Sequence, residues 1–181
     1  MDKLYIKKVL KGEVEAFSYL VRKYQDFSFS SAMAIVKDEA VAKDLVQDSF
    51  LQAFHALEKY REEASFSTWL YRIVINNCLK FLAKEKSKTK HLERLPKITI
   101  LSSDSIVIME QKELQIQLRQ AIAKLPAKTA IVVQLFYLEE YSIKEIEGIT
   151  PFSAANIKVL LHRGRKQLKT LLADFFLQNQ K

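Results

Sequence analysis

The sequence is poor in cysteine and in the two residues that form tight turns. Its 181 residues include three glycines, three prolines and one cysteine, Cys78. So few glycines and prolines argue against sandwiches, barrels and doubly wound sheets, which need many tight turns. A single cysteine excludes an internal disulfide framework and a zinc site built from several thiolates. This cysteine usage also fits a reducing compartment.

The scarcity of glycine also excludes the common nucleotide-binding loops. Gly12, Gly148 and Gly164 are too far apart in the chain to form a dinucleotide fingerprint or a Walker-type loop. Cys78 lies within a predicted helix without the local signature of a nucleophile, and the histidines are widely separated. We therefore expect a protein that is not an enzyme and that needs no metal or other cofactor.

Long hydrophobic runs are missing as well. The longest apolar segment, Thr129–Leu138, has about half the length that is needed to cross a bilayer. The amino-terminal segment, Met1–Lys11, contains four lysines and no uninterrupted apolar core, so it is not typical of a secretory signal. We expect no membrane insertion and a cytoplasmic location.

Positive charge is present in excess and is concentrated in two segments. The formal net charge is +8. The segment Lys80–Arg94 holds six basic and two acidic residues, and Lys158–Lys169 holds five basic residues and no acidic one. Two basic patches are typical of a protein that binds a polyanion, because each neutralised phosphate releases counterions. Solvated helix faces would give the same pattern, since cations also stabilise helix carboxyl ends.

Hydrophobic residues make up 49% of the chain and recur at three- and four-residue spacing, which predicts an all-α fold. In the first half, this spacing predicts helices over Glu13–Val36, Asp38–Arg61 and Phe66–Leu82. Either Ser67 or Thr68 is the expected N-cap of the last of these helices. These segments are expected to pack together as one helical domain.

A second helical domain is predicted after a break in the periodicity. Between residues 87 and 108, lysines are followed by Pro96 and a serine-rich stretch, which is typical of a flexible linker. The sequence therefore predicts two helical domains, residues 1–86 and 109–181, joined by a linker over residues 87–108.

The second domain ends in a pattern that is typical of a helix-turn-helix. Helices are expected over Met109–Leu125 and Lys128–Leu138, and then over Ser142–Ile146 with Ser142 as its cap. A turn over Gly148–Phe152 leads to a final helix that begins at Ser153 and carries the second basic patch. Such a helix fits the major groove of DNA, although helical hairpins without a DNA function are also common.

Several motifs, in this order, resemble bacterial RNA polymerase sigma factors of the extracytoplasmic-function (ECF) class. The resemblance covers nearly the whole chain, and it depends on the mutual spacing of several motifs rather than on any one of them. The motifs are Asp44–Leu51, Phe66–Ile73 with Asn76, Leu125–Pro126, Tyr141–Ile146, Asn156–Val159 and Leu161–Leu168.

The resemblance implies a factor that directs core RNA polymerase to specific promoters and helps to open the -10 region. The expected partners are core RNA polymerase, promoter DNA and an anti-sigma factor, and the free protein is expected to be a monomer. A stand-alone helix-turn-helix regulator remains the alternative interpretation. It would dimerise and bind duplex DNA tightly without polymerase.

The resemblance also assigns three sets of residues. The expected contact with core polymerase, called the polar strip, consists of Asp44, Gln47, Asp48 and Leu51. The expected -10 surface consists of Tyr60, Phe66, Ser67, Thr68, Trp69, Arg72, Asn76 and Lys80. The expected -35 contact, called the recognition face, consists of Ser153, Asn156, Lys158, Val159, His162, Arg163, Arg165 and Lys166.

Some of these residues have a structural alternative, and two positions depart from the family pattern. Trp69 begins an amphipathic helix, so it could belong to the core instead of stacking on a base. Leu160 stands where the family often has arginine, and Pro151 replaces the usual glycine of the turn. We expect the fold to tolerate both changes, but the promoter sequence cannot be carried over from the family.

Overall fold

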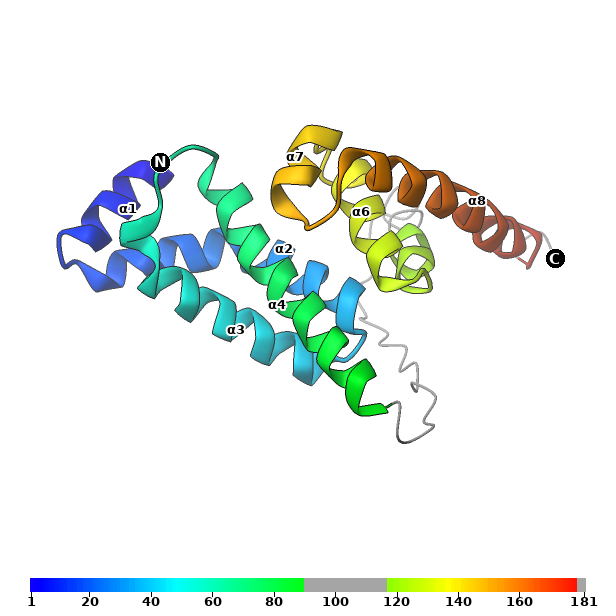
Figure 1. Ribbon diagram of the computed structural model, residues 1–181, viewed down its shortest axis with the longest axis horizontal. Helices are drawn as coiled ribbons and strands as arrows, with labels where there is room; N and C mark the ends of the chain where they lie inside the picture. Colours follow the sequence, from blue (N-terminus) through cyan, green and yellow to red (C-terminus); the bar gives the residue numbers. More distant parts are fainter. Residues whose placement is uncertain (90–116, 179–181) are drawn as a thin grey trace.

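The structure is a computed structural model that describes residues 1–89 and 117–178, and within these ranges it contains helices and no strand (Figure 1). This confirms the all-α prediction. None of the helices in these two ranges is both long enough and apolar enough to span a membrane. The elements in the first range are α1 (Asp2–Leu10), η1 (Val14–Ala16), α2 (Phe17–Val36), α3 (Glu39–His55), η2 (Leu57–Lys59) and α4 (Phe66–Thr89).

Three of these helices form the amino-terminal core. Helices α2, α3 and α4 all contact one another. Leu20 on α2 and Leu70 on α4 are fully buried, as expected for the apolar faces of amphipathic helices. The side-chain amide of Asn77 on α4 donates to Ser49 Oγ at 3.0 Å and to Gln52 Oε1 at 2.9 Å, which links α4 to α3.

The boundaries of α3 differ from the predicted ones at one end. Asp38 is the N-cap, and its carboxylate accepts a hydrogen bond from the backbone N–H of Val41 at 3.0 Å. The helix ends at His55 instead of continuing to Arg61, so this part of the prediction is wrong. The chain turns at Ala56 into η2, and this turn buries Leu57 in the core.

The start and the end of α4 also differ from the prediction. The N-cap is Ser65 instead of Ser67 or Thr68, because the Ser65 hydroxyl accepts the backbone N–H of Thr68 at 3.1 Å. The helix continues to Thr89, well beyond Leu82. The remainder of the predicted linker, residues 90–108, lies outside the described residues.

The second range contains a helical stretch at residues 117–123, α6 (Ala127–Tyr137), α7 (Ile143–Ile149) and α8 (Ala154–Gln178). Ser142 caps α7, as predicted, and the structure shows a capping box with Glu145, but α7 continues past Ile146 to Ile149. Gly148 therefore lies in α7 and not in the turn. Helices α7 and α8 form the predicted helix-turn-helix, and both pack on α6.

The two helical units pack against each other. Helix α2 contacts α6, and α4 contacts α7 (Figure 1). The side-chain amide of Gln134 donates to Ser30 Oγ at 2.6 Å, and Lys37 Nζ donates to the Leu125 carbonyl oxygen at 2.7 Å. Gln134 is buried, so its hydrogen bond satisfies a polar group that water cannot reach.

Candidate nucleic-acid interface

The polar strip is exposed along α3. All four of its residues are accessible, and Leu51 keeps 51% of its surface exposed, which places an apolar side chain beside the carboxylates of Asp44 and Asp48. Ala42 and Val46 on the opposite side of the helix are buried in the core. The helical period of α3 therefore separates a core face from a mixed acidic and apolar face.

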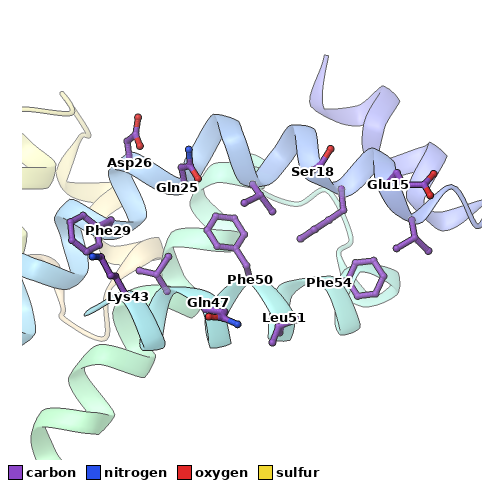
Figure 2. A pocket seen from close by; sticks show the side chains of 14 residues that line it. Glu15, Ser18, Gln25, Asp26, Phe29, Lys43, Gln47, Phe50, Leu51 and Phe54 are labelled. Atoms are coloured by element: carbon purple, nitrogen blue, oxygen red, sulfur yellow. The ribbon is translucent and has the colours of Figure 1, made fainter. Parts of the chain in front are cut away.

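An apolar groove of about 690 Å³ lies beside the polar strip, between α2 and α3. Gln47 and Leu51 belong to the polar strip and also line this groove. Figure 2 shows Phe50 pointing from α3 toward α2. Phe54, which also lines the groove, is only partly buried. The groove was not predicted from the sequence, because a pocket between two helices depends on how the helices pack and leaves no local signal.

Part of the -10 surface forms one hollow of about 260 Å³. Tyr60, Thr68, Trp69 and Arg72 line it, Lys59 and Arg61 add positive charge, and Glu63 adds one carboxylate. An aromatic hollow with cations at its rim can accept an unstacked base while the cations contact phosphates.

The other residues of the -10 surface lie differently. Phe66 is buried with 3% of its surface exposed, and its ring packs on those of Tyr60 and Trp69. Asn76 and Lys80 follow on α4 and are not among the residues that line the hollow. Lys80 lines a separate hollow with Asp48 of the polar strip.

The recognition face of α8 is exposed throughout. All eight of its residues are accessible, and Val159 keeps 46% of its surface exposed. Ile157, Leu161 and Leu168 point the other way, into the core. Leu160 is also buried, so at this position the chain has a core residue where the family often has arginine.

The turn before α8 accommodates its proline. Thr150, which precedes Pro151, has an extended backbone with φ −108° and ψ 162°, as a residue before proline prefers. The Glu147 carboxylate accepts the backbone N–H of Ala154 at 2.9 Å, and Ser153 Oγ accepts that of Asn156 at 3.4 Å. These two contacts satisfy free amides at the start of α8.

The side chains that could coordinate a metal ion are not grouped as a metal site in the part of the chain that the structure describes. No group of three or more His, Cys, Asp or Glu side chains could hold a metal ion there. Cys78 is buried, and burial raises the pKa of its thiol to about 12, which keeps it protonated and unreactive.

Two family models match the chain, and they cover the surfaces described above. Sigma-70 region 2 matches residues 20–88, which include the polar strip and the -10 surface. Sigma-70, region 4 matches residues 115–168, which include the recognition face. Together, the helical fold and these two regions define a sigma factor of the sigma-70 class.

The relatives narrow this class further. The chain is 31% identical to the ECF RNA polymerase sigma factor SigW of Bacillus subtilis, over 96% of this chain and 98% of the relative. It is 27% identical to the ECF RNA polymerase sigma-E factor of Salmonella typhimurium, over 92% of both chains. The chain therefore belongs to the ECF RNA polymerase sigma factors, which direct RNA polymerase to promoters.

Solved structures share the fold. The sigma factor RpoE in complex with the anti-sigma factor NepR from Bartonella quintana aligns with a TM-score of 0.72 at 18% identity, over 88% of this chain and 98% of that chain. CnrH in complex with the cytosolic domain of CnrY aligns with a TM-score of 0.64 at 21% identity, over 96% and 97% of the two chains.

Proposed function

We propose that the two helical units recognise the two promoter elements separately. The unit that ends with α4 at Thr89 binds core polymerase and the -10 element, residues 109–181 bind the -35 element, and the chain between them links the two. The recognition face carries this proposal, because every residue assigned to it is exposed and all but Ser153, which directly precedes α8, stand on the second helix of a helix-turn-helix. Such a helix inserts into the major groove and reads base edges with its first turns.

Within the recognition face, side-chain chemistry divides base contacts from phosphate contacts. Asn156 can form a bidentate pair with adenine, and Arg163 can do so with guanine. Ser153, Arg165 and Lys166 are suited to phosphates, which position the helix but carry no sequence information.

At the -10 element, the hollow beside Trp69 captures an unstacked base, and cations on α4 follow the strand. Tyr60 and Trp69 supply aromatic surface, while Arg72 and Lys80 supply charge. This surface binds the separated strand and makes or breaks no covalent bond. The protein is therefore a binding subunit and not an enzyme.

The polar strip binds a helical surface of core polymerase. Its carboxylates would repel DNA phosphates, whereas an exposed leucine among acidic residues is suited to a protein partner with basic and apolar side chains. An anti-sigma factor that covers these surfaces would hold the protein inactive, and both solved relatives are complexes with a second protein. We place the binding to polymerase and the inhibition by an anti-sigma factor in the cytoplasm, where the free protein is a monomer.

Native co-migration with bacterial core RNA polymerase tests the proposal. The wild type is compared with the double variant Asp48→Ala and Leu51→Ala, and with Glu58→Ala as a control for an exposed acidic residue outside the strip. We expect the double variant to bind about tenfold or more weakly, because it removes an apolar anchor and a charge from the interface. The control should bind like the wild type.

Two other outcomes would contradict the proposal in different ways. Unchanged affinity of the double variant would remove the polar strip from the polymerase interface. A folded wild type that forms no complex, but dimerises and binds duplex DNA tightly alone, would favour a stand-alone regulator.

A further inference from the structure

The first turn of α1 lies against the loop that precedes α4. In Figure 1, the amino terminus lies beside the segment that leads from η2 to α4. Lys3 Nζ donates to Glu62 Oε2 at 2.7 Å, and α1 also contacts η2. This segment, residues 60–65, is called the -10 loop below, because it borders the hollow of the -10 surface.

The middle of the -10 loop has a backbone conformation that its residue does not favour. Glu62 has φ 57°, in the left-handed region where residues other than glycine are uncommon. The ends of the loop are fixed by other contacts: the Tyr60 hydroxyl donates to the Ala64 carbonyl at 2.7 Å, and Ser65 caps α4. The ion pair with Lys3 holds the middle of the loop from outside.

Helix α1 is firmly attached to α2, so it can serve as a fixed support. Ile6 and Val9 are buried, and the Tyr5 ring stacks on Tyr19 with a centroid separation of 3.8 Å.

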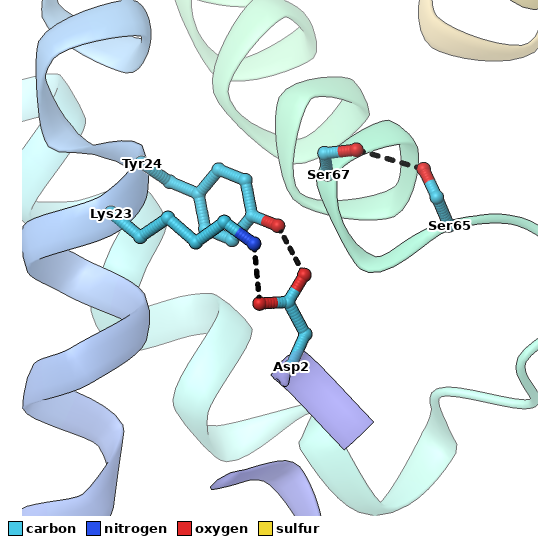
Figure 3. Close-up of polar contacts among 5 residues, drawn as sticks. All are labelled: Asp2, Lys23, Tyr24, Ser65 and Ser67. Carbon is cyan, nitrogen blue, oxygen red and sulfur yellow. Dashed lines mark hydrogen bonds and ion pairs between the residues drawn. The ribbon is translucent and has the colours of Figure 1, made fainter. Parts of the chain in front are cut away.

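The attachment includes Asp2, the neighbour of Lys3. Figure 3 shows its carboxylate accepting hydrogen bonds from Lys23 Nζ at 2.6 Å and from the Tyr24 hydroxyl at 2.5 Å. Burial opposes ionisation of Asp2, but these hydrogen bonds outweigh it and keep its pKa below the usual value. The charge that anchors α1 is therefore retained at neutral pH.

The -10 loop is continuous with the base-binding hollow. Tyr60 and Arg61 belong to the loop and line the hollow, and the Tyr60 ring lies 5.3 Å from that of Trp69. Burial raises the pKa of the Tyr60 hydroxyl, and the charges of Glu62 and Lys3 also act on it. A substitution of Lys3 can therefore alter the hollow, because one short segment of backbone connects Glu62 to the residues that line it.

We infer that Lys3 is a positioning residue for promoter recognition: through Glu62 it holds the -10 loop in the conformation that selects a base of the -10 element. The inference rests on the proposed role of the -10 surface. Both side chains are well exposed, at 73% and 41%, so their ion pair contributes little to the stability of the whole fold. Its effect is expected in base selection rather than in folding.

The test measures transcription by core polymerase and the full-length protein from promoters that carry each of the four bases at each -10 position. The readout is the ratio of transcript from the preferred base to that from the others. Lys3→Ala should lower this ratio by about threefold or more, with a smaller effect on the preferred promoter itself. Lys8→Ala is the matched control, since it removes the same charge and another ion pair, with Glu13, from α1.

A charge exchange separates positioning from a general loss of charge. Lys3→Glu and Glu62→Lys should each lower the ratio, and the double variant should restore most of it, because the ion pair is then rebuilt in reverse. The single variant Glu62→Lys excludes a purely electrostatic attraction to DNA, because it adds positive charge beside the hollow and would then strengthen promoter binding without lowering the ratio. Circular dichroism checks that each variant is folded.

Two outcomes would overturn the inference, and they can be distinguished. If the wild type selects a -10 base and Lys3→Ala selects it equally well, the inference fails and the proposed -10 surface stands. If the wild type initiates from these promoters without any base preference at the -10 positions, the proposed -10 surface and the inference both fail.

Discussion

Gly164 allows the closest approach between α8 and α6. A Cβ atom at this position would overlap the side chain of Val133 and press on that of Thr129. Val133 is fully buried and β-branched, so it cannot move aside easily. A single hydrogen atom in place of a side chain therefore sets how α8 packs, and with it the orientation of the recognition face.

Gly164→Ala is expected to destabilise the protein, even though alanine is the better helix former. The gain in helix propensity is about 1 kcal/mol, whereas overpacking in a rigid core costs about 1–3 kcal/mol. Denaturant unfolding should show a net loss of about 1 kcal/mol. Gly148→Ala is the matched control, because its Cβ would meet only Thr68 at 3.9 Å and should be neutral or stabilising. Equal stability of both variants would contradict this packing argument.

For single residues, the resemblance to the family selected exposed positions in the two helical sets but did not resolve the aromatic residues. Every residue of the polar strip and of the recognition face is exposed. Phe66 and Trp69 are only three residues apart, yet one is buried and the other lines the hollow. That difference depends on Tyr24, which packs on Phe66 from another helix and therefore leaves no local signal.

Helix α8 combines packing and recognition on opposite faces of one element. Its buried side, with Ile157 and Leu161, fixes the helix on the domain, and its exposed side carries Asn156 and Arg163. The first turn is held by hydrogen bonds to Ser153 and Glu147. The residues that would meet DNA therefore stand on a rigid support.

Arg163→Ala should reduce initiation that depends on the -35 element. Loss of a bidentate contact with guanine costs about 1–3 kcal/mol, which corresponds to about a 5- to 150-fold loss at the cognate promoter and relaxed selectivity at one base pair. Lys169→Ala, which removes an exposed cation of the same helix, should instead weaken all promoters equally. Transcription assays on -35 variants measure both effects. Wild-type selectivity in Arg163→Ala would mean that the recognition face is placed incorrectly.

The limits of the elements were harder to predict than their existence. The cap at Ser142 was predicted from the sequence. The end of α3 was not, because the helix stops at His55 and the chain turns to bury Leu57, although the hydrophobic spacing continues beyond this point. Helix α1 was not predicted, although Ile6 and Val9 have helical spacing. A helix this short depends on its contacts with α2, which the local sequence does not reveal.

At the scale of the whole molecule, the packing of the two units restricts access to DNA. Gly148 of α7 lines the same hollow as Tyr60 and Trp69, so the second unit lies at the edge of the -10 surface. The -10 and -35 elements lie about 25 base pairs apart, which is roughly 85 Å of duplex. The proposed binding of both elements therefore requires the units, which contact each other through α2, α4, α6 and α7, to separate.

Weakening the contacts between the units should therefore favour the open form. The variant Lys37→Met with Gln134→Ala removes the hydrogen bonds to the Leu125 carbonyl and to Ser30 Oγ. Each bond contributes about 0.5–1.5 kcal/mol, so losing both shifts the equilibrium about 5- to 150-fold toward separation. Small-angle scattering should show a larger radius of gyration, and single-stranded -10 DNA should bind more tightly. Arg22→Ala, which loses only a contact with Ser18 within α2, should change neither quantity. An unchanged radius and affinity in the double variant would show that other contacts hold the units together, because the two hydrogen bonds would then contribute too little to bias the equilibrium.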